Sequence, residues 1–138
     1  MTLSAKEKID LSRYRIDKAK RLLEDAQSLY DAASYESAIN RIYYAVLTAA
    51  RALLILRGID PETHEGVKTM LTKEFIRTGL LPKEFGETFR SIRARRIDSD
   101  YGDYVEISIK EASESLKQSQ EFVKKLEGVL NDMIEKMG

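Results

Sequence analysis

The chain has 138 residues, the length of one domain, with no cysteine and a single histidine. Disulfides, thiolate metal sites, cysteine nucleophiles and sites that need two imidazoles from one chain are therefore excluded. The 23 basic and 23 acidic side chains cancel, so the whole molecule is not expected to attract nucleic acid or anionic membranes, and a phosphate site would be a local patch.

Helices are predicted throughout, because turn formers are few and apolar residues recur at three- and four-residue steps. A first helix is predicted over about residues 5–32, opened by the capping-box spacing of Ser4 and Glu7. A second helix is predicted from a cap at Ser34 to Arg57, where a glycine follows.

The third and fourth helices are predicted from their prolines. Asp60 followed by Pro61 places a capping carboxylate before a proline at the first helical position, and this helix is predicted to end near Gly79. The next proline opens a fourth helix over roughly residues 82–97.

Residues 98–104 are predicted to form a polar connection, and Ser108 with Glu111 forms a second capping box that opens the last helix. No segment shows the alternation of a β-strand. Short loops make neighbouring helices antiparallel, so we expect an all-α, up-and-down four-helix bundle with an extra short helix, in a single domain over residues 1–138.

The most apolar run, residues 42–56, would be about 22 Å long as a helix, shorter than a hydrocarbon core of about 30 Å. The N-terminus becomes charged at once and lacks the apolar region of a secretory signal. We therefore expect a buried core helix, no membrane contact and a cytoplasmic protein.

Polar Asn40 and the adjacent Tyr43 and Tyr44 lie in this apolar second helix. Neighbouring helical residues point about 100° apart, so the two tyrosines must face different surroundings. Buried polar groups need partners, which favours a core hydrogen-bond network. The alternative is that one tyrosine lines a binding cleft or a subunit contact.

Four arginines near residue 93 precede a run of acidic residues. Arg90, Arg93 and Arg96 are three residues apart and spread over about 120° of a helix. Guanidinium groups bind phosphate oxygens in bidentate fashion, so the cluster could hold an RNA backbone or a nucleotide. The alternative is a network of salt bridges at the end of the bundle.

His64 is predicted in the first turn of the third helix, where a local hydrogen bond or general-base catalysis would each suit it. The chain contains no GxxxxGK[ST], GxGxxG, GxSxG or HExxH motif. We accordingly expect no metal site and no cofactor.

Residues from about 26 to 124 resemble the HEPN superfamily (higher eukaryotes and prokaryotes nucleotide-binding), in particular its branch of small prokaryotic proteins. The segments that carry the resemblance are AINRIYYA at 38–45, AARALL at 49–54, HEGV at 64–67, FIRTGLLP at 75–82 and RIDSDY at 96–101.

The resemblance implies a homodimeric helical bundle with a cleft at the end of the penultimate helix. Catalytic HEPN proteins are metal-independent ribonucleases, often toxins encoded beside a minimal nucleotidyltransferase that serves as antitoxin. Their motif is an arginine followed after four to six residues by a histidine. Arg96 matches the arginine, but no histidine follows it; this branch has Arg-x-x-x-Asp-Tyr instead, matched by Arg96, Asp100 and Tyr101.

The function that this resemblance implies is an RNA- or nucleotide-binding protein of a toxin–antitoxin-like pair, with ribonuclease activity as its catalytic form. Arg96 would clamp phosphate, Asp100 would act as base or orienter, and Tyr101 would donate a hydrogen bond. Further binding candidates are Arg93, Asn40, Tyr43, Tyr44, His64 and Tyr104. Tyr101 or Tyr104 could also be modified by the nucleotidyltransferase.

Two other hypotheses remain open. The missing histidine is compatible with a non-catalytic helical module that docks on a minimal nucleotidyltransferase and regulates it. Alternatively, Arg93, Arg95 and Arg96 are purely structural.

Overall fold

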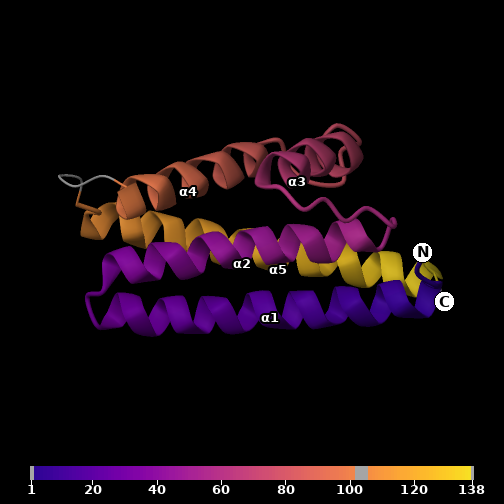
Figure 1. Ribbon diagram of the computed structural model, residues 1–138, viewed down its shortest axis with the longest axis horizontal. Coiled ribbons are helices and arrows are strands. Elements are labelled where there is room, and N and C mark those ends of the chain that lie inside the picture. The colour runs from indigo at the N-terminus through magenta and orange to yellow at the C-terminus, as the bar shows by residue number, and fades with distance from the viewer. Residues whose placement is uncertain (1, 102–105, 138) are drawn as a thin grey trace.

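The computed structural model describes residues 2–101, except the side chain of Tyr101, and residues 106–137. Its elements, in chain order, are α1 (Ala5–Asp31), α2 (Tyr35–Ile55), α3 (His64–Leu71), the π-helical segment η1 (Thr72–Ile76), α4 (Glu84–Tyr101) and α5 (Ile109–Met137) (Figure 1).

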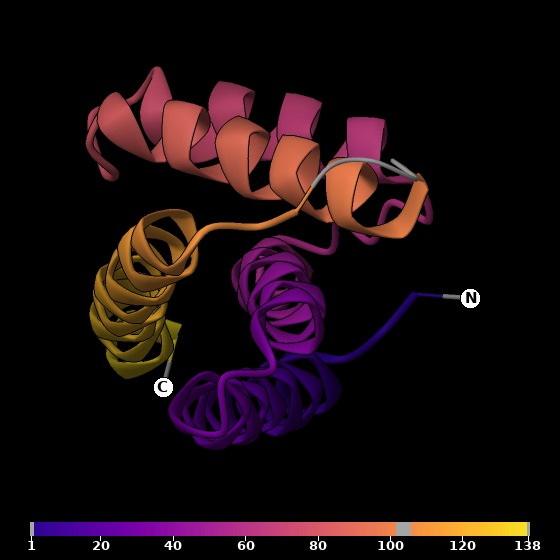
Figure 2. The ribbon, with the colours of Figure 1, turned by 90° about the vertical axis from the view of Figure 1, so that its left-hand side faces the viewer.

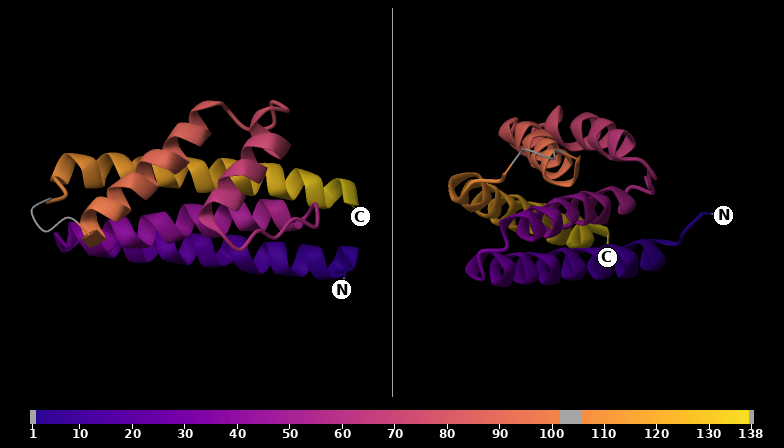
Figure 3. Two further views of the ribbon diagram at one scale, coloured as in Figure 1. Left: turned by 45° about the horizontal axis from the view of Figure 1, so that its top comes forward. Right: turned by 60° about the vertical axis from the view of Figure 1, so that its left-hand side comes forward.

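Three long helices, α1, α2 and α5, lie side by side, and α3, η1 and α4 cover one side of them (Figures 1 and 2). Helix α4 crosses the long helices obliquely (Figure 3). Helix α2 is central, since it packs against α1, α3, α4 and α5. The predicted all-α bundle is confirmed.

Helix α2 forms the middle of the core because its buried side is apolar and largely small. Five of its alanines are fully buried, which lets neighbouring helices approach closely: Ala38, Ala45, Ala49, Ala50 and Ala52. The helix has 21 residues and is apolar enough to cross a bilayer by length and composition, but 67% of its most apolar window is buried inside the bundle. The predicted core helix is confirmed.

Both predicted capping boxes are present. The Glu7 amide donates to Ser4 Oγ at 3.1 Å, and the Ser4 amide donates to Glu7 Oε1 at 3.0 Å. At the start of α5, the Glu111 amide donates to Ser108 Oγ at 3.1 Å, and the Ser108 amide donates to Glu111 Oε1 at 3.3 Å. Ser34 occupies the N-cap position of α2, but its side chain makes no capping hydrogen bond.

The predicted start of the third helix is wrong. Helix α3 begins at His64, and its cap is Thr63, whose Oγ1 accepts from the Gly66 amide at 3.0 Å. Asp60 does not cap it, because its carboxylate accepts from Arg15 at 3.0 and 3.2 Å and from Arg51 at 3.0 Å.

The predicted end of the fourth helix is also wrong. Helix α4 continues through Asp98, Ser99 and Asp100 to Tyr101, where the sequence had indicated a polar connection. One reason is the i,i+4 ion pair between Arg96 and Asp100, which supports helix in this last turn. The extension places Asp100 one turn beyond Arg96 on the same side of α4.

Candidate functional site

The crossing of α4 over α2 holds Arg96 against two tyrosine rings. Its Nη2 donates to Tyr44 Oη at 3.3 Å. Its guanidinium carbon lies 4.8 Å from the centroid of the Tyr43 ring and 5.4 Å from that of Tyr44. The two rings meet edge to face, with centroids 5.1 Å apart. Cation–π attraction and the hydrogen bond therefore fix this guanidinium on α2.

Asp100 forms the other contact of Arg96. Its Oδ2 lies 3.3 Å from Arg96 Nε, and the two side chains are 32% and 22% exposed. Nε itself is buried, and its geometry toward the carboxylate is that of an ion pair rather than of a hydrogen bond. The pair is thus anchored on its inner side and reached by solvent on its outer side.

A hollow of about 290 Å³ opens beside this pair, between the start of α2 and the end of α4. Asn40 and Asp100 line it together with Glu36, Ser37, Arg41 and Ser99. Two carboxylates, a guanidinium, an amide and two hydroxyls offer donors and acceptors for sugar hydroxyls, base edges and a phosphate.

Tyr43 and His64 form an inner layer beneath Arg96. Tyr43 is only 4% exposed, and its Oη lies 3.0 Å from His64 Nδ1. The imidazole stacks on Phe89, with ring centroids 4.6 Å apart, and on Tyr43 at 5.6 Å. Tyr43 thus belongs to a core hydrogen-bond network, as the first interpretation predicted, and Tyr44 lies at the surface beside Arg96.

The electrostatics of this inner layer keep both rings neutral at pH 7. Burial, and then the positive charge of Arg93, lower the pKa of His64 to about 4. Burial raises the pKa of Tyr43, although the charges of Arg96 and Arg93 oppose the shift. The imidazole lies between the rings of Phe89 and Tyr43 and its Nδ1 faces the Tyr43 hydroxyl, so the geometry gives His64 a packing and hydrogen-bonding role.

The side chains of the other arginines in the predicted cluster contact three different helices. Arg93 Nη1 lies 2.7 Å from Glu65 Oε1 on α3. Arg95 turns to α5, where its Nη1 donates to Ser115 Oγ at 2.7 Å. Arg90 pairs with Glu87 on its own helix. Of the alternative, a salt-bridge network with the acidic run that follows, the Arg96–Asp100 pair is present, whereas the other arginines pair with glutamates. Among these arginines, Arg96 is the one held against the tyrosines of α2.

Two candidates cannot be placed. The side chain of Tyr101, at the end of α4, and the whole of Tyr104 lie outside the described residues.

Sequence reasoning missed several residues of this region. Glu36 and Ser99 line the hollow, and the Phe89 ring stacks on the imidazole of His64. Glu36 is one turn before Asn40, so helical spacing could have indicated it. The stacking of Phe89 on His64 joins two helices through tertiary packing and leaves no sequence signal.

The fold and the site define an all-helical bundle that presents an arginine–carboxylate pair at the end of its penultimate helix. The model of the HEPN domain matches residues 12–129, and the chain therefore belongs to the HEPN family.

Curated relatives and a solved structure agree with this assignment. A "UPF0332 protein" of Thermotoga maritima is 31% identical over 127 residues, covering 92% of this chain and 96% of the relative. A protein of Methanocaldococcus jannaschii named "Putative toxin" is 36% identical over 110 residues, covering 80% and 75%. The crystal structure of TT1696 from Thermus thermophilus shares the fold with a TM-score of 0.72 at 20% identity, covering 86% of this chain and 97% of that one.

Proposed function

We propose that this protein is the RNA-binding, toxin-like member of a toxin–antitoxin pair in the cytoplasm and that it cleaves RNA without a metal ion. The observation that carries the proposal is the placement of Arg96, held by Asp100 at 3.3 Å and by Tyr44 at 3.3 Å beside a polar hollow. Membership of the HEPN family and the name of the Methanocaldococcus relative support it.

In the proposed reaction the 2′-oxygen of a ribose attacks the adjacent phosphorus while the bond from phosphorus to the 5′-oxygen breaks. The carboxylate of Asp100 takes the proton from the 2′-hydroxyl, and water returns a proton to the departing 5′-oxygen. Arg96 stabilises the negative charge on the phosphate oxygens in the transition state. The products are a 2′,3′-cyclic phosphate and a 5′-hydroxyl.

Arg96 is partly preorganised for this role. Its contacts with Tyr43 and Tyr44 limit its rotamers before substrate binds, which reduces the ordering cost at the transition state. A phosphate would compete with Asp100 for the guanidinium, and that exchange would free the carboxylate to accept a proton.

The test is cleavage of a labelled RNA in the presence of EDTA. Wild type should cleave, and Arg96→Ala and Asp100→Ala should each lose about 10²-fold or more of the rate. Arg21→Ala, an exposed arginine on α1, is the matched control and should cleave like wild type. Circular dichroism should show that all variants are folded. Equal cleavage by all four proteins would contradict the proposed roles.

A non-catalytic function is the second candidate, and one observation favours it. The single histidine of the chain is packed between Tyr43 and Phe89, with its pKa near 4. On this hypothesis the bundle docks on a minimal nucleotidyltransferase and regulates it. The same assay decides between the two, because wild type would then leave RNA intact while co-purifying with such a partner.

We also propose that two copies of the chain form a homodimer, as the HEPN resemblance implies, and that Tyr101 and Tyr104 take part in binding or are modified by the partner. The remaining candidates for ligand contact are Asn40, which lines the hollow, Tyr44, which accepts from Arg96, and Arg93, one turn before Arg96 on α4.

A further inference from the structure

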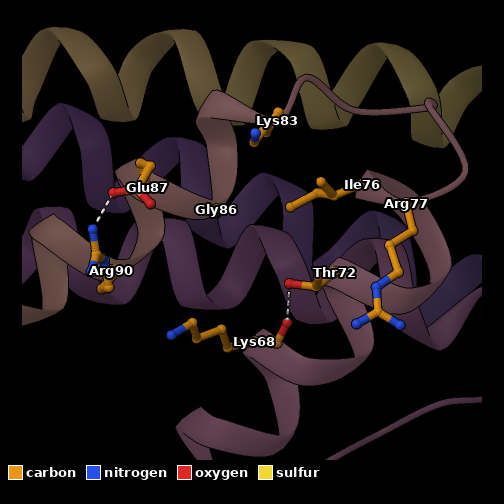
Figure 4. A pocket seen from close by; sticks show the side chains of 8 residues that line it. All are labelled: Lys68, Thr72, Ile76, Arg77, Lys83, Gly86, Glu87 and Arg90. Atoms are coloured by element: carbon orange, nitrogen blue, oxygen red, sulfur yellow. Dashed lines mark hydrogen bonds and ion pairs between the residues drawn. The ribbon is translucent and has the colours of Figure 1, made fainter.

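A second hollow, of about 530 Å³, lies between η1 and α4 and shares no lining residue with the hollow beside Arg96. Four cationic side chains surround it: Lys68, Arg77, Lys83 and Arg90 (Figure 4). Its other lining residues are Thr72, Ile76, Gly86 and Glu87. A volume of this size accommodates a nucleotide-sized group.

Three of the four cations are available to a ligand. Arg90 pairs with Glu87 at one side of the hollow. Lys68, Arg77 and Lys83 form no ion pair with any residue in the described part of the chain. The hollow therefore keeps a surplus of positive charge in a molecule whose formal net charge is zero.

The floor of the hollow is apolar, and the π-helical segment forms it. Ile76 and Thr72 both belong to η1, and Thr72 Oγ1 donates back to the Lys68 carbonyl at 2.9 Å, which keeps this polar group satisfied. On the opposite side Gly86 has no side chain to cover the floor. A Cβ at this position would lie 3.6 Å from Ile76 Cδ1, in van der Waals contact with it. π-Helical segments are rare and occur frequently at functional sites.

Further arginines of α4 lie between the hollow and Arg96. A smaller hollow shares Lys68, Thr72 and Arg77 with it and is also lined by Glu65, the partner of Arg93. From Arg90 through Arg93 to Arg96 the helix rises only about 9 Å. Cationic side chains thus follow one another from the hollow to the candidate catalytic pair.

We propose that the hollow between η1 and α4 binds the phosphate backbone of single-stranded RNA, with a base against its Ile76–Gly86 floor, and extends the Arg96 site. This inference rests on the RNA-binding part of the proposed function. Charge complementarity identifies the occupant: unpaired lysine and arginine side chains suit successive phosphates, and an apolar floor suits an unstacked base.

The experiment measures binding of a fluorescent oligouridine to the full chain by anisotropy, at several salt concentrations. The triple variant Lys68→Gln, Arg77→Gln, Lys83→Gln should bind roughly tenfold to a hundredfold more weakly, and the slope of log K against log [salt] should become shallower by about 2. The matched control, Lys18→Gln, Arg21→Gln, Lys125→Gln, removes the same charge from exposed positions on α1 and α5 and should bind like wild type.

A second variant tests the floor without changing any charge. Gly86→Leu fills the space in front of Ile76, so it should weaken binding while the salt slope stays as in wild type. Free uridine monophosphate distinguishes a nucleotide pocket from a strand-binding site. It should compete far more weakly than unlabelled oligouridine, and equal competition would overturn the proposal.

The outcomes separate this inference from the proposed function. If the triple variant binds oligouridine as tightly as the control, the proposal that the hollow binds RNA is wrong, even if Arg96→Ala abolishes cleavage. If the triple variant loses binding and the wild type does not cleave RNA, the hollow binds RNA but the proposed ribonuclease activity is wrong. Melting curves of each variant show whether the fold is intact.

Discussion

At the scale of single residues, Tyr43 and Tyr44 show how two neighbours in sequence serve the interior and the surface. One hydroxyl lies 3.0 Å from the partly buried imidazole of His64, and the other accepts from Arg96 at 3.3 Å. Both rings lie near the same guanidinium carbon, at 4.8 and 5.4 Å. A substitution in the inner layer of Tyr43 and His64 should therefore change the position of the Arg96 guanidinium.

The stability of the protein should depend on pH through His64. Its pKa is about 4 in the folded chain and near 6.5 when unfolded, so the folded state binds fewer protons between these values. The stabilisation is complete above pH 6.5 and is lost as the pH falls toward 4. Between pH 7 and pH 5 the wild type should lose about 1–2 kcal/mol more than His64→Asn, measured by urea unfolding, because solvent reaches part of the ring and weakens the effect.

The control for this measurement is the variant itself, since every carboxylate is common to both proteins. The charged groups near the imidazole are Arg93, Glu65, Lys68 and Arg96. Parallel pH profiles for wild type and variant would show that the imidazole titrates normally in the folded state.

The sequence indicated most members of the candidate site but not their relations. Arg96 and Asp100 are four residues apart, so a helix brings them together once it is known to continue that far. The contacts of Arg96 with Tyr44, and of Tyr43 with His64, join residues 52 and 21 positions apart. Such contacts depend on how α4 and α3 cross α2, and side-chain type alone does not determine them.

At the scale of elements, the turns that end helices differ in how well their residues suit them. Ala33, between α1 and α2, has a φ of 61°, a left-handed conformation that costs a non-glycine residue about 1–2 kcal/mol. Gly79, after η1, has a φ of 83° and fits the same region without this cost.

Substitutions at these two turns should therefore have opposite signs. Ala33→Gly should raise the free energy of unfolding by about 0.5–1 kcal/mol, and Gly79→Ala should lower it by about 1 kcal/mol. The measurement is thermal or urea unfolding of both variants. Because a Cβ at Gly79 meets no atom within 4 Å, a loss there reports backbone strain alone. Changes of the same sign would contradict this account.

Helix boundaries could be predicted where the signal is local. The capping boxes at Ser4 and Ser108 each consist of a hydroxyl and a carboxylate three residues apart, and both form as expected. Asp60, which precedes Pro61, also has the local signal of a helix cap, but Arg15 of α1 donates two hydrogen bonds to its carboxylate. Tertiary partners thus decided where the local signal failed.

At the scale of the whole molecule, the bundle is organised around the small residues of α2. Ala49 is fully buried in the core, so a larger side chain there must displace its neighbours. Ala49→Leu should lower the free energy of unfolding by about 1–3 kcal/mol. The matched control is Ala94→Leu at an exposed position of α4, which should change it by less than about 0.5 kcal/mol. Equal stability of the two variants would show that the core accommodates the extra volume.

The architecture could be predicted from helical periodicity and short connections, which require that neighbouring helices pair. The oblique layer of α3, η1 and α4 could not, because its direction depends on side-chain packing over α2 and α5 (Figure 3). Both hollows lie along this layer, so the part of the molecule that sequence describes least is also the part with the candidate sites.

The π-helical segment has a consequence for how such a layer arises. A turn closed by i→i+5 hydrogen bonds holds one residue more than an α-helical turn. Deleting one codon within residues 72–76 would remove that extra residue and let regular α-helical winding continue from α3. A single insertion or deletion in a gene therefore separates a smooth helix from one that offers a recess, a short evolutionary step for gaining or losing a ligand.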